Sequence, residues 1–231
     1  MPGEGEKRAT PSRRYSVLVG LAFLVLVGIA TVNTIGNRGR GILGATKGER
    51  GMPLPEFAVP NAVTGPLDKD ANVAQDNCST SENPCPSGAA RTPACEIHAA
   101  GAIRVCDLFT RPLVLSFWFT KAANCVPTQD IVNRVAGRYR GRVNFLSIDV
   151  RDDPTAVRTI VGQHGWTIPI GYDRDGAVAE LYRVGVCPTL AFAYPGGIMD
   201  FAKVGELSAG QLNADVRRLV RDSRARANET R

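Results

Sequence analysis

The six cysteines are the residues of this chain that could carry covalent chemistry, because a thiolate can attack a disulfide, bind a metal or close a structural disulfide. Cys125 follows Asn124 and lies two residues before Pro127. A helix capped by Asn124 would place Pro127 in its first turn, where proline is tolerated, and Cys125 at its first position. There the helix dipole and the free N–H groups favour a thiolate, and Lys121 would add positive charge. Cys125 is therefore a candidate nucleophile.

Four further cysteines, Cys78, Cys85, Cys95 and Cys106, lie within residues 64–111, a polar stretch too long for an ordinary loop. We predict two local disulfides, Cys78–Cys85 and Cys95–Cys106, that staple a segment without a core of its own. The second pair would bracket a hairpin. The other pairings stay open, because four cysteines allow three connectivities. Disulfides are typical of an oxidising compartment.

A zinc site is the alternative for these four cysteines. Their spacings of six, nine and ten intervening residues do not give the usual C-x₂₋₄-C pairs. The two histidines, His98 and His164, are far apart in the sequence. Disulfides are therefore preferred, and no metal site is predicted.

The order of the remaining elements predicts an α/β domain. Two apolar runs, residues 112–119 and 142–150, are typical of buried parallel strands. Between them, Ile131, Val135 and Tyr139 recur at every fourth position, as in an amphipathic helix. Further along we expect helices opening at 152–154 and covering 177–182, strands over 188–194 and 198–204 joined by a tight turn at 195–197, and a last helix capped by Ser208. This order favours a central mixed sheet flanked by helices.

Several short motifs follow one another along these elements: Phe117-Trp118-Phe119-Thr120, the helix bearing Cys125, Ser147-Ile148-Asp149-Val150, Ile168-Pro169, Tyr172-Asp173-Arg174-Asp175-Gly176, Tyr182-Arg183-Val184, Cys187-Pro188-Thr189, Pro195-Gly196-Gly197 and Gly205. This succession resembles the TlpA/ResA-like redoxins, membrane-tethered thiol–disulfide oxidoreductases with a thioredoxin-like fold. The resemblance covers about residues 53–221, with residues 76–108 as a Cys-rich insertion. It implies that Pro188 is cis and lies beside the active site.

One departure from the family bears on the chemistry. The family carries Trp-Cys-x-x-Cys after its Phe-Trp strand, whereas here Ala122 stands in the place of the first cysteine and only Cys125 remains. In this fold the residue before the cis-proline faces the active-site cysteines, and here that residue is Cys187. We therefore hypothesise that Cys125 and Cys187 form a redox pair, with Pro188 shaping the substrate groove and Trp118 and Lys121 tuning the surroundings.

Two other interpretations stay open at this point. Cys187 could be a small apolar filler and Cys125 a buried remnant of the motif, which would leave a redox-inactive binding or structural module. Single-cysteine peroxide chemistry is a weaker option, since Thr120 and Cys125 are spaced differently from the Thr-x-x-Cys of peroxiredoxins.

The N-terminal region predicts a membrane anchor. No charged residue occurs from Tyr15 to Asn37, and about 20 apolar residues suffice to span a bilayer as a helix. A cleaved signal peptide is the rival interpretation, but its apolar region would be shorter. We expect a cytoplasmic tail over residues 1–14, a transmembrane helix over 15–36 and a linker over 37–55. A thioredoxin-like domain would follow over 56–221 and a disordered basic tail over 222–231.

The formal charge of +6 does not indicate a nucleic-acid partner, since the basic residues gather near the two ends without an aromatic-interleaved motif. We expect a single-pass protein of the cell membrane whose C-terminal domain lies outside the cytoplasm. Its predicted activity is thiol–disulfide exchange with protein thiols and disulfides, by Cys125 and Cys187 and without a cofactor. The sequence does not indicate an oligomeric state.

Overall fold

A computed structural model describes residues 20–28, 51–65, 73–74, 79–80, 83–84, 93–121 and 125–229. The chain divides into two compact units, Met1–Arg40 and Gly41–Arg231. In the first unit, residues 20–28 form a helix with exposed side chains. Among the described parts of the chain, none of the helices combines the length and the apolar character needed to cross a membrane. Most of the predicted anchor, residues 15–36, lies outside the described residues.

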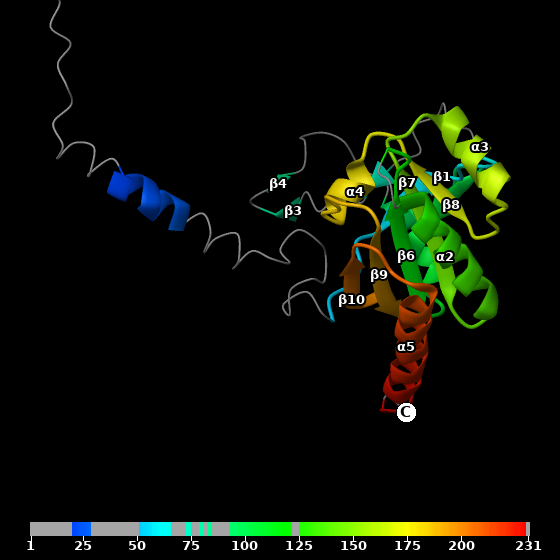
Figure 1. The fold of residues 1–231 in the computed structure, drawn as a ribbon. Coiled ribbons are helices and arrows are strands. Elements are labelled where there is room, and N and C mark those ends of the chain that lie inside the picture. The colour runs from blue at the N-terminus through cyan, green and yellow to red at the C-terminus, as the bar shows by residue number, and fades with distance from the viewer. Residues whose placement is uncertain are drawn as a thin grey trace, which may run out of the picture. The chain divides into compact units, whose positions relative to one another are not determined.

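A five-stranded mixed sheet forms the centre of the second unit (Figure 1), in the order β10–β9–β6–β7–β8. β6 (Leu113–Trp118) pairs in parallel with β7 (Asn144–Val150), which pairs in parallel with β8 (Ile170–Asp173). On its other side β6 pairs antiparallel with β9 (Thr189–Tyr194), and β9 pairs antiparallel with β10 (Ile198–Val204). The predicted central mixed sheet is confirmed.

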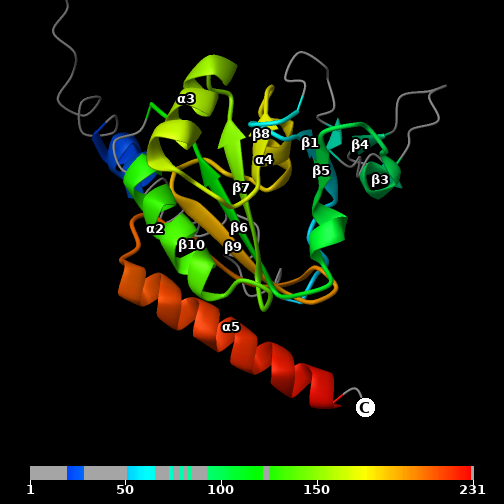
Figure 2. The same ribbon diagram turned by 90° about the vertical axis from the view of Figure 1, so that its right-hand side faces the viewer.

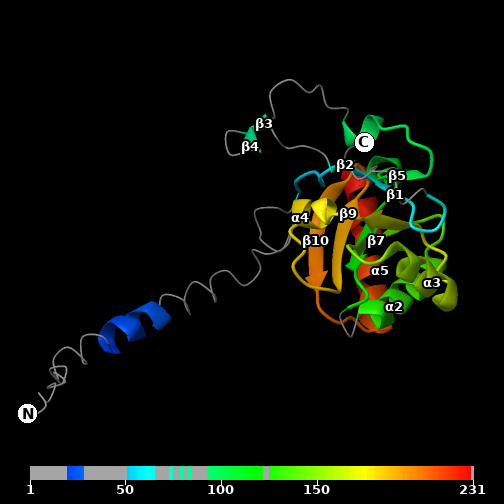
Figure 3. The ribbon, with the colours of Figure 1, turned by 90° about the horizontal axis from the view of Figure 1, so that it is seen from above.

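Helices and a second small sheet cover the two faces of this sheet. α2 (Cys125–Arg138) and α5 (Ala209–Glu229) pack on one face, and α3 (Pro154–His164) lies beside α2 (Figure 2). The other face is covered by α4 (Ala177–Leu181) and by the sheet β2–β1–β5, which lies on the side opposite α2 and α5 (Figure 3). The strands of the small sheet are β1 (Phe57–Pro60), β2 (Val73–Ala74) and β5 (Ala102–Arg104). The strands β3 (Ser79–Thr80) and β4 (Asn83–Pro84) form a separate pair.

The alternation of side chains along β6 explains why this strand is central. Leu113, Leu115 and Phe117 pack into the cluster that includes β1 and α4. Val114 packs against side chains of α2 and α5, and Trp118 joins a third cluster near the start of α2. Because both faces are buried, the strand reads as a continuous apolar run rather than as an alternating one.

The segment carrying Cys95 and Cys106 is built differently from the prediction. It consists of a 3-10 helix η1 (Ala94–Glu96), strand β5 and a second 3-10 helix η2 (Val105–Leu108). The expected hairpin over Glu96 to Val105 is wrong, because β5 pairs antiparallel with β1 instead. Val105 is fully buried in the core, so this end of the predicted insertion 76–108 belongs to the folded domain.

The predicted linker 37–55 is also too long at its C-terminal end. The backbone N–H of Gly51 donates to the carbonyl of Met199 at 2.8 Å, and that of Leu54 to the carbonyl of Gly197 at 2.7 Å. Leu54 is buried in the main cluster. These residues lie along β10, so the folded domain starts before residue 56.

The predicted disordered tail 222–231 is wrong over residues 222–229, which continue α5. Ser208 and Gln211 form a reciprocal cap at its start, since each side chain accepts from the other residue's backbone N–H. Near its end the guanidinium of Arg226 lies over the ring of Tyr194, 4.6 Å from the centroid. The helix is thus held to the sheet beyond residue 221.

Candidate redox site

Cys125 and Cys187 are joined by a disulfide, although 62 residues separate them in the sequence. Their Cα atoms are 5.6 Å apart, within the range that a disulfide requires. The bond links the start of α2 to the loop before β9, so its two sulfurs come from different elements.

Local sequence explains the position of Cys125. α2 begins at Cys125, which places Pro127 in the first turn, where its missing N–H breaks no helical hydrogen bond. Asn124 and Ala122 lie outside the described residues. Cys125 is 1% exposed and belongs to a cluster that includes Trp118, Val157, Val161, Trp166, Ile170 and Tyr172. The helix start therefore offers its N–H groups to a sulfur that is shielded from water.

Cys187 is held by the loop that follows α4. The Cys187–Pro188 peptide bond is cis, as the family resemblance implies. The Thr189 hydroxyl donates to the Val186 carbonyl at 2.6 Å, and the Gly205 N–H donates to the Pro188 carbonyl at 2.9 Å. Pro188 is buried, whereas Cys187 is half-buried and Val186 is 50% exposed. Of the two bonded cysteines, Cys187 is the one that solvent reaches.

Trp118 and Lys121, which we expected to tune the site, lie in different environments. Trp118 is buried and meets Trp166 edge-to-face, with ring centroids 5.0 Å apart. It forms part of the apolar cluster around Cys125. Lys121 is exposed on the segment between β6 and α2. Trp118 thus lines the buried side of the Cys125–Cys187 pair, whereas the side chain of Lys121 is exposed to solvent.

A buried acid, Asp149, lies in β7 beside two members of the cluster around Cys125. Asp149 pairs with Trp118 on β6 and with Tyr172 on β8, and both of those side chains belong to the cluster around Cys125. Burial, reinforced by the neighbouring Asp152 carboxyl, raises the pKa of Asp149 to about 9. Asp149 is therefore a neutral carboxylic acid at pH 7.

The hydrogen bonding around Asp149 fits this protonation state. Neither oxygen of the Asp149 carboxyl has a partner of ordinary hydrogen-bond geometry among the described residues, and the nearby backbone N–H of Asp152 favours the ionised form too little to offset burial. When protonated, its hydroxyl can donate to Asp152, whose carboxylate also accepts from the backbone N–H and the hydroxyl of Thr120. Thr120 lies two residues beyond the end of β6, so Asp152 holds the chain just after this strand.

The sequence reasoning missed this role of Asp149. Asp149, Asp152 and Asp153 lie at and just after the end of β7, and in the sequence a strand end followed by a helix N-terminus is enough to explain acidic residues there. That explanation holds for Asp153, whose side chain accepts from the N–H groups of Thr155 and Ala156 at the start of α3. The available signal was a single charged residue inside the apolar run of β7.

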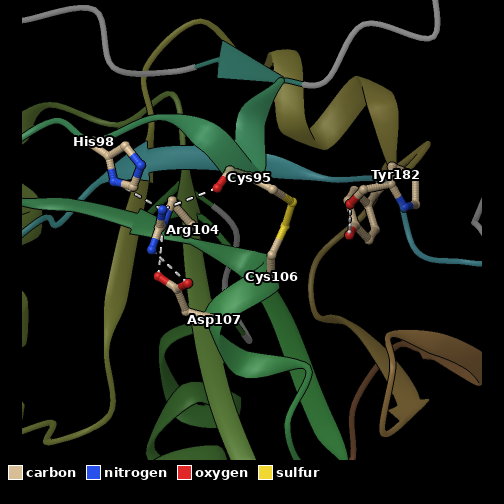
Figure 4. The surroundings of a disulfide bond; sticks show 7 residues. Cys95, His98, Arg104, Cys106, Asp107 and Tyr182 are labelled. Atoms are coloured by element: carbon tan, nitrogen blue, oxygen red, sulfur yellow. Dashed lines mark hydrogen bonds and ion pairs between the residues drawn. A yellow bond between two sulfur atoms is a disulfide. The ribbon is translucent and has the colours of Figure 1, made fainter. Parts of the chain in front are cut away.

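A second disulfide joins Cys95 to Cys106, with Cα atoms 5.8 Å apart. It links η1 to η2 (Figure 4), and Cys106 packs against the main hydrophobic cluster. Cys78 and Cys85, the other predicted pair, lie outside the described residues.

A hollow of about 290 Å³ lies elsewhere on the domain. It is lined by residues at the C-terminal end of α2 and the start of β7, among them Gly137, Arg140 and Phe145. Cys125 is at the opposite end of α2, so this hollow is separate from the cysteine pair.

The arrangement of Cys125 and Cys187 is chemically suited to thiol–disulfide exchange. An incoming thiolate can reach the half-buried Cys187, and the displaced thiolate of Cys125 would sit at a helix N-terminus, where negative charge is stabilised. A lower pKa makes a thiol a better leaving group in this reaction.

No protein-family model matches the chain, but curated proteins resemble it in sequence. The chain is 23% identical over 111 residues to the thiol-disulfide oxidoreductase ResA of Oceanobacillus iheyensis, covering 48% of this chain and 58% of that protein. It is 25% identical over 119 residues to the ResA of Bacillus thuringiensis, covering 51% and 69%. The chain thus spans little more than half the length of the Oceanobacillus relative. The resemblance to ResA-like redoxins is confirmed.

A solved structure supports the fold. The structure of a thiol:disulfide interchange protein of the thioredoxin family from Chlorobium tepidum superposes with a TM-score of 0.52. It is 15% identical and the match covers 74% of this chain and 97% of that protein. The domain therefore has a thioredoxin-like α/β fold.

Proposed function

We propose that this protein is a thiol–disulfide oxidoreductase in which Cys125 and Cys187 together replace the usual cysteine pair. The observation that carries the proposal is the disulfide between the start of α2 and the residue before the cis-proline. The similarity to proteins named thiol-disulfide oxidoreductases supports it.

The unequal exposure of the two cysteines supports different roles for them. In the reducing direction, the Cys187 thiolate attacks one sulfur of a partner's disulfide, a mixed disulfide forms and the partner's other sulfur leaves as a thiolate. The Cys125 thiolate then attacks Cys187, which forms the intramolecular disulfide and releases the second partner thiolate. Two electrons pass from the cysteine pair to the partner, and the partner's thiolates take up the protons. The oxidising direction is the reverse.

These roles refine the expectation from the sequence, in which Cys125 was the central thiol. Because Cys125 is 1% exposed, a protein partner cannot reach it without movement of the site. Its position at the helix start makes it the better leaving thiolate, and the exposed Val186 beside Cys187 offers an apolar contact to a partner chain.

We also propose that the domain works outside the cytoplasmic membrane on protein thiols and disulfides, tethered by the apolar residues 15–36. Two disulfides among the described residues support an oxidising compartment. The long uncharged segment supports the tether.

Insulin reduction by the full-length chain in detergent tests the activity, with a dithiol as the electron source. We expect wild type to accelerate the reaction and both Cys125→Ser and Cys187→Ser to fall to the uncatalysed rate. The matched control is Cys95→Ser with Cys106→Ser, which removes the other described disulfide and should keep the activity as long as circular dichroism shows a folded domain.

The opposite result would identify a different kind of protein. Rates that are negligible and equal in wild type and in both single variants would overturn the proposal. They would favour a redox-inactive thioredoxin-fold module, the alternative that Ala122 suggests at the position of the missing cysteine.

A further inference from the structure

We propose that Cys95, Cys106 and Glu56 form a redox-controlled site for a thiophilic divalent cation such as Zn²⁺, which is closed by the disulfide and opened by its reduction. One ligand atom from each residue lies within 4.8 Å of the other two. The three residues come from separate elements: Glu56 precedes β1, Cys95 is in η1 and Cys106 is in η2. The site is independent of the Cys125–Cys187 pair and of the function proposed for it.

The chemistry of the three ligands suits zinc. Thiolate sulfur and carboxylate oxygen are ligands of tetrahedral Zn²⁺, at about 2.3 Å and 2.0–2.2 Å respectively. Two thiolates on one zinc ion are about 3.8 Å apart, so the sulfurs must separate by roughly 1.7 Å from their disulfide distance. All three residues are half-buried, which lets an ion enter and leaves a fourth position for water.

Arg104 keeps the two cysteines close when the disulfide is broken. Its guanidinium donates to the backbone carbonyl of Cys95 at 3.1 Å and makes two hydrogen bonds of 2.9 Å to the carboxylate of Asp107, the residue after Cys106 (Figure 4). It also contacts Nδ1 of His98 at 3.3 Å. Since β5 is paired with β1, both cysteines stay beside Glu56 without the S–S bond.

The charges around the site allow a cation to bind. Arg104 and Asp107 form an ion pair at 2.9 Å, so the arginine's positive charge is compensated next to the site. Two thiolates would then face the ion together with the Glu56 carboxylate. This is the kind of ligand set for which zinc competes well with lighter divalent metals.

The reaction balances as two separate steps. A dithiol reductant transfers two electrons and two protons to the Cys95–Cys106 bond and becomes a disulfide itself. Binding of Zn²⁺ then forms two Zn–S bonds and one Zn–O bond and releases the two thiol protons. In the reverse direction a disulfide compound accepts two electrons from the two thiolates and takes up two protons to become a dithiol, while the Cys95–Cys106 bond re-forms and Zn²⁺ is released.

Protection of the thiols from alkylation tests the proposal in the full-length chain. The protein is reduced, the reductant is removed without oxygen, and the cysteines are alkylated with and without Zn²⁺ before peptide mapping by mass spectrometry. We expect Zn²⁺ to slow the alkylation of Cys95 and Cys106 together. Glu56→Gln should weaken the protection at least about tenfold, as loss of a ligand or its support does.

Glu96 provides the matched control, because it is an exposed carboxylate next to Cys95 outside the ligand set. In the Glu96→Gln variant, Zn²⁺ should slow the alkylation of Cys95 and Cys106 as much as it does in wild type. Three results would overturn the proposal: equal alkylation of the two cysteines with and without Zn²⁺, a Glu56→Gln variant indistinguishable from Glu96→Gln, or a reduced chain in which circular dichroism shows that the domain has unfolded.

Discussion

Cys187 lies directly before a cis-proline, and its Cα atom is 5.6 Å from that of Cys125, the first residue of α2, with a disulfide between them. A Cys-x-x-Cys motif would place both sulfurs on one helical turn. Here the bond joins the helix start to a loop 62 residues further along the chain. Reduction therefore releases two elements from each other.

The first prediction concerns which cysteine meets a partner. Cys125→Ser leaves the half-buried Cys187 thiol, which should form a stable mixed disulfide with oxidised glutathione because the resolving sulfur is absent. Cys187→Ser leaves only the buried Cys125 and should form little of this adduct. Mass spectrometry of the folded variants measures both. Faster adduct formation at Cys125 would reverse the assigned roles.

The second prediction concerns stability. Closing a loop of 62 residues stabilises a folded protein by about 4 kcal/mol in the chain-entropy treatment, whereas a loop of 11 residues gives about 3 kcal/mol. The double variant Cys125→Ser/Cys187→Ser should therefore lose more unfolding free energy than Cys95→Ser/Cys106→Ser. Urea unfolding of the two variants measures the difference. A larger loss in the second variant would contradict the prediction.

The third prediction follows from the raised pKa of Asp149. Folded Asp149 keeps its proton up to pH about 9, whereas an unfolded Asp loses it near 3.8. Between these values the folded state holds the extra proton, so stability falls as the pH rises, by up to about 1.4 kcal/mol per pH unit. The unfolding free energy of Asp149→Asn should depend less on pH than that of wild type. Relative to wild type, the variant should therefore become more stable as the pH rises toward 9.

Thermal unfolding between pH 4 and pH 9 measures this dependence. Asp153→Asn is the control, because Asn caps a helix about as well as Asp and Asp153 is the exposed cap of α3. If Asp149→Asn and wild type had parallel pH profiles, the buried acid would not be protonated in the folded protein. The Asp152 and Asp173 carboxyls, which also face Asp149, both act to raise its pKa.

The fourth prediction tests the extended C-terminal helix. Arg226→Ala removes the cation lying over the ring of Tyr194 and should lower the unfolding free energy by about 0.5–1 kcal/mol. Arg224 lies on the exposed side of the same helix, so Arg224→Ala should be neutral within about 0.5 kcal/mol. Equal effects of the two substitutions would mean that the helix end is not held by the sheet.

The central elements could be predicted because their sequence patterns come from burial itself. The expected strand 112–119 is Leu113–Trp118, and the expected strand 142–150 is Asn144–Val150. Both are covered on two faces, which leaves an apolar run in the sequence. The start of α2 at Cys125 followed from the position of Pro127.

Other features could not be predicted, because they depend on contacts between distant residues. β5 has three residues and pairs with β1 more than forty positions earlier, so neither the strand nor its partner leaves a local pattern. The basic end of α5 was interpreted as a loose tail, but Arg226 lies over the ring of Tyr194 and Ser223 is buried. The approach of Cys187 to Cys125 came from the family resemblance, since no periodicity in the sequence relates the two residues.

The most direct test of the account is to measure the redox state of Cys125 and Cys187 in the full-length chain. The chain is equilibrated in dithiol/disulfide buffers of increasing reducing strength, and alkylation with peptide mapping then reports which thiols are free. We predict that the two cysteines are disulfide-bonded to each other under oxidising conditions, become alkylated together as the buffer becomes reducing, and re-form the bond when it is reversed. Two thiols that stay free in oxidising buffer, or that bond to other cysteines, would contradict the account.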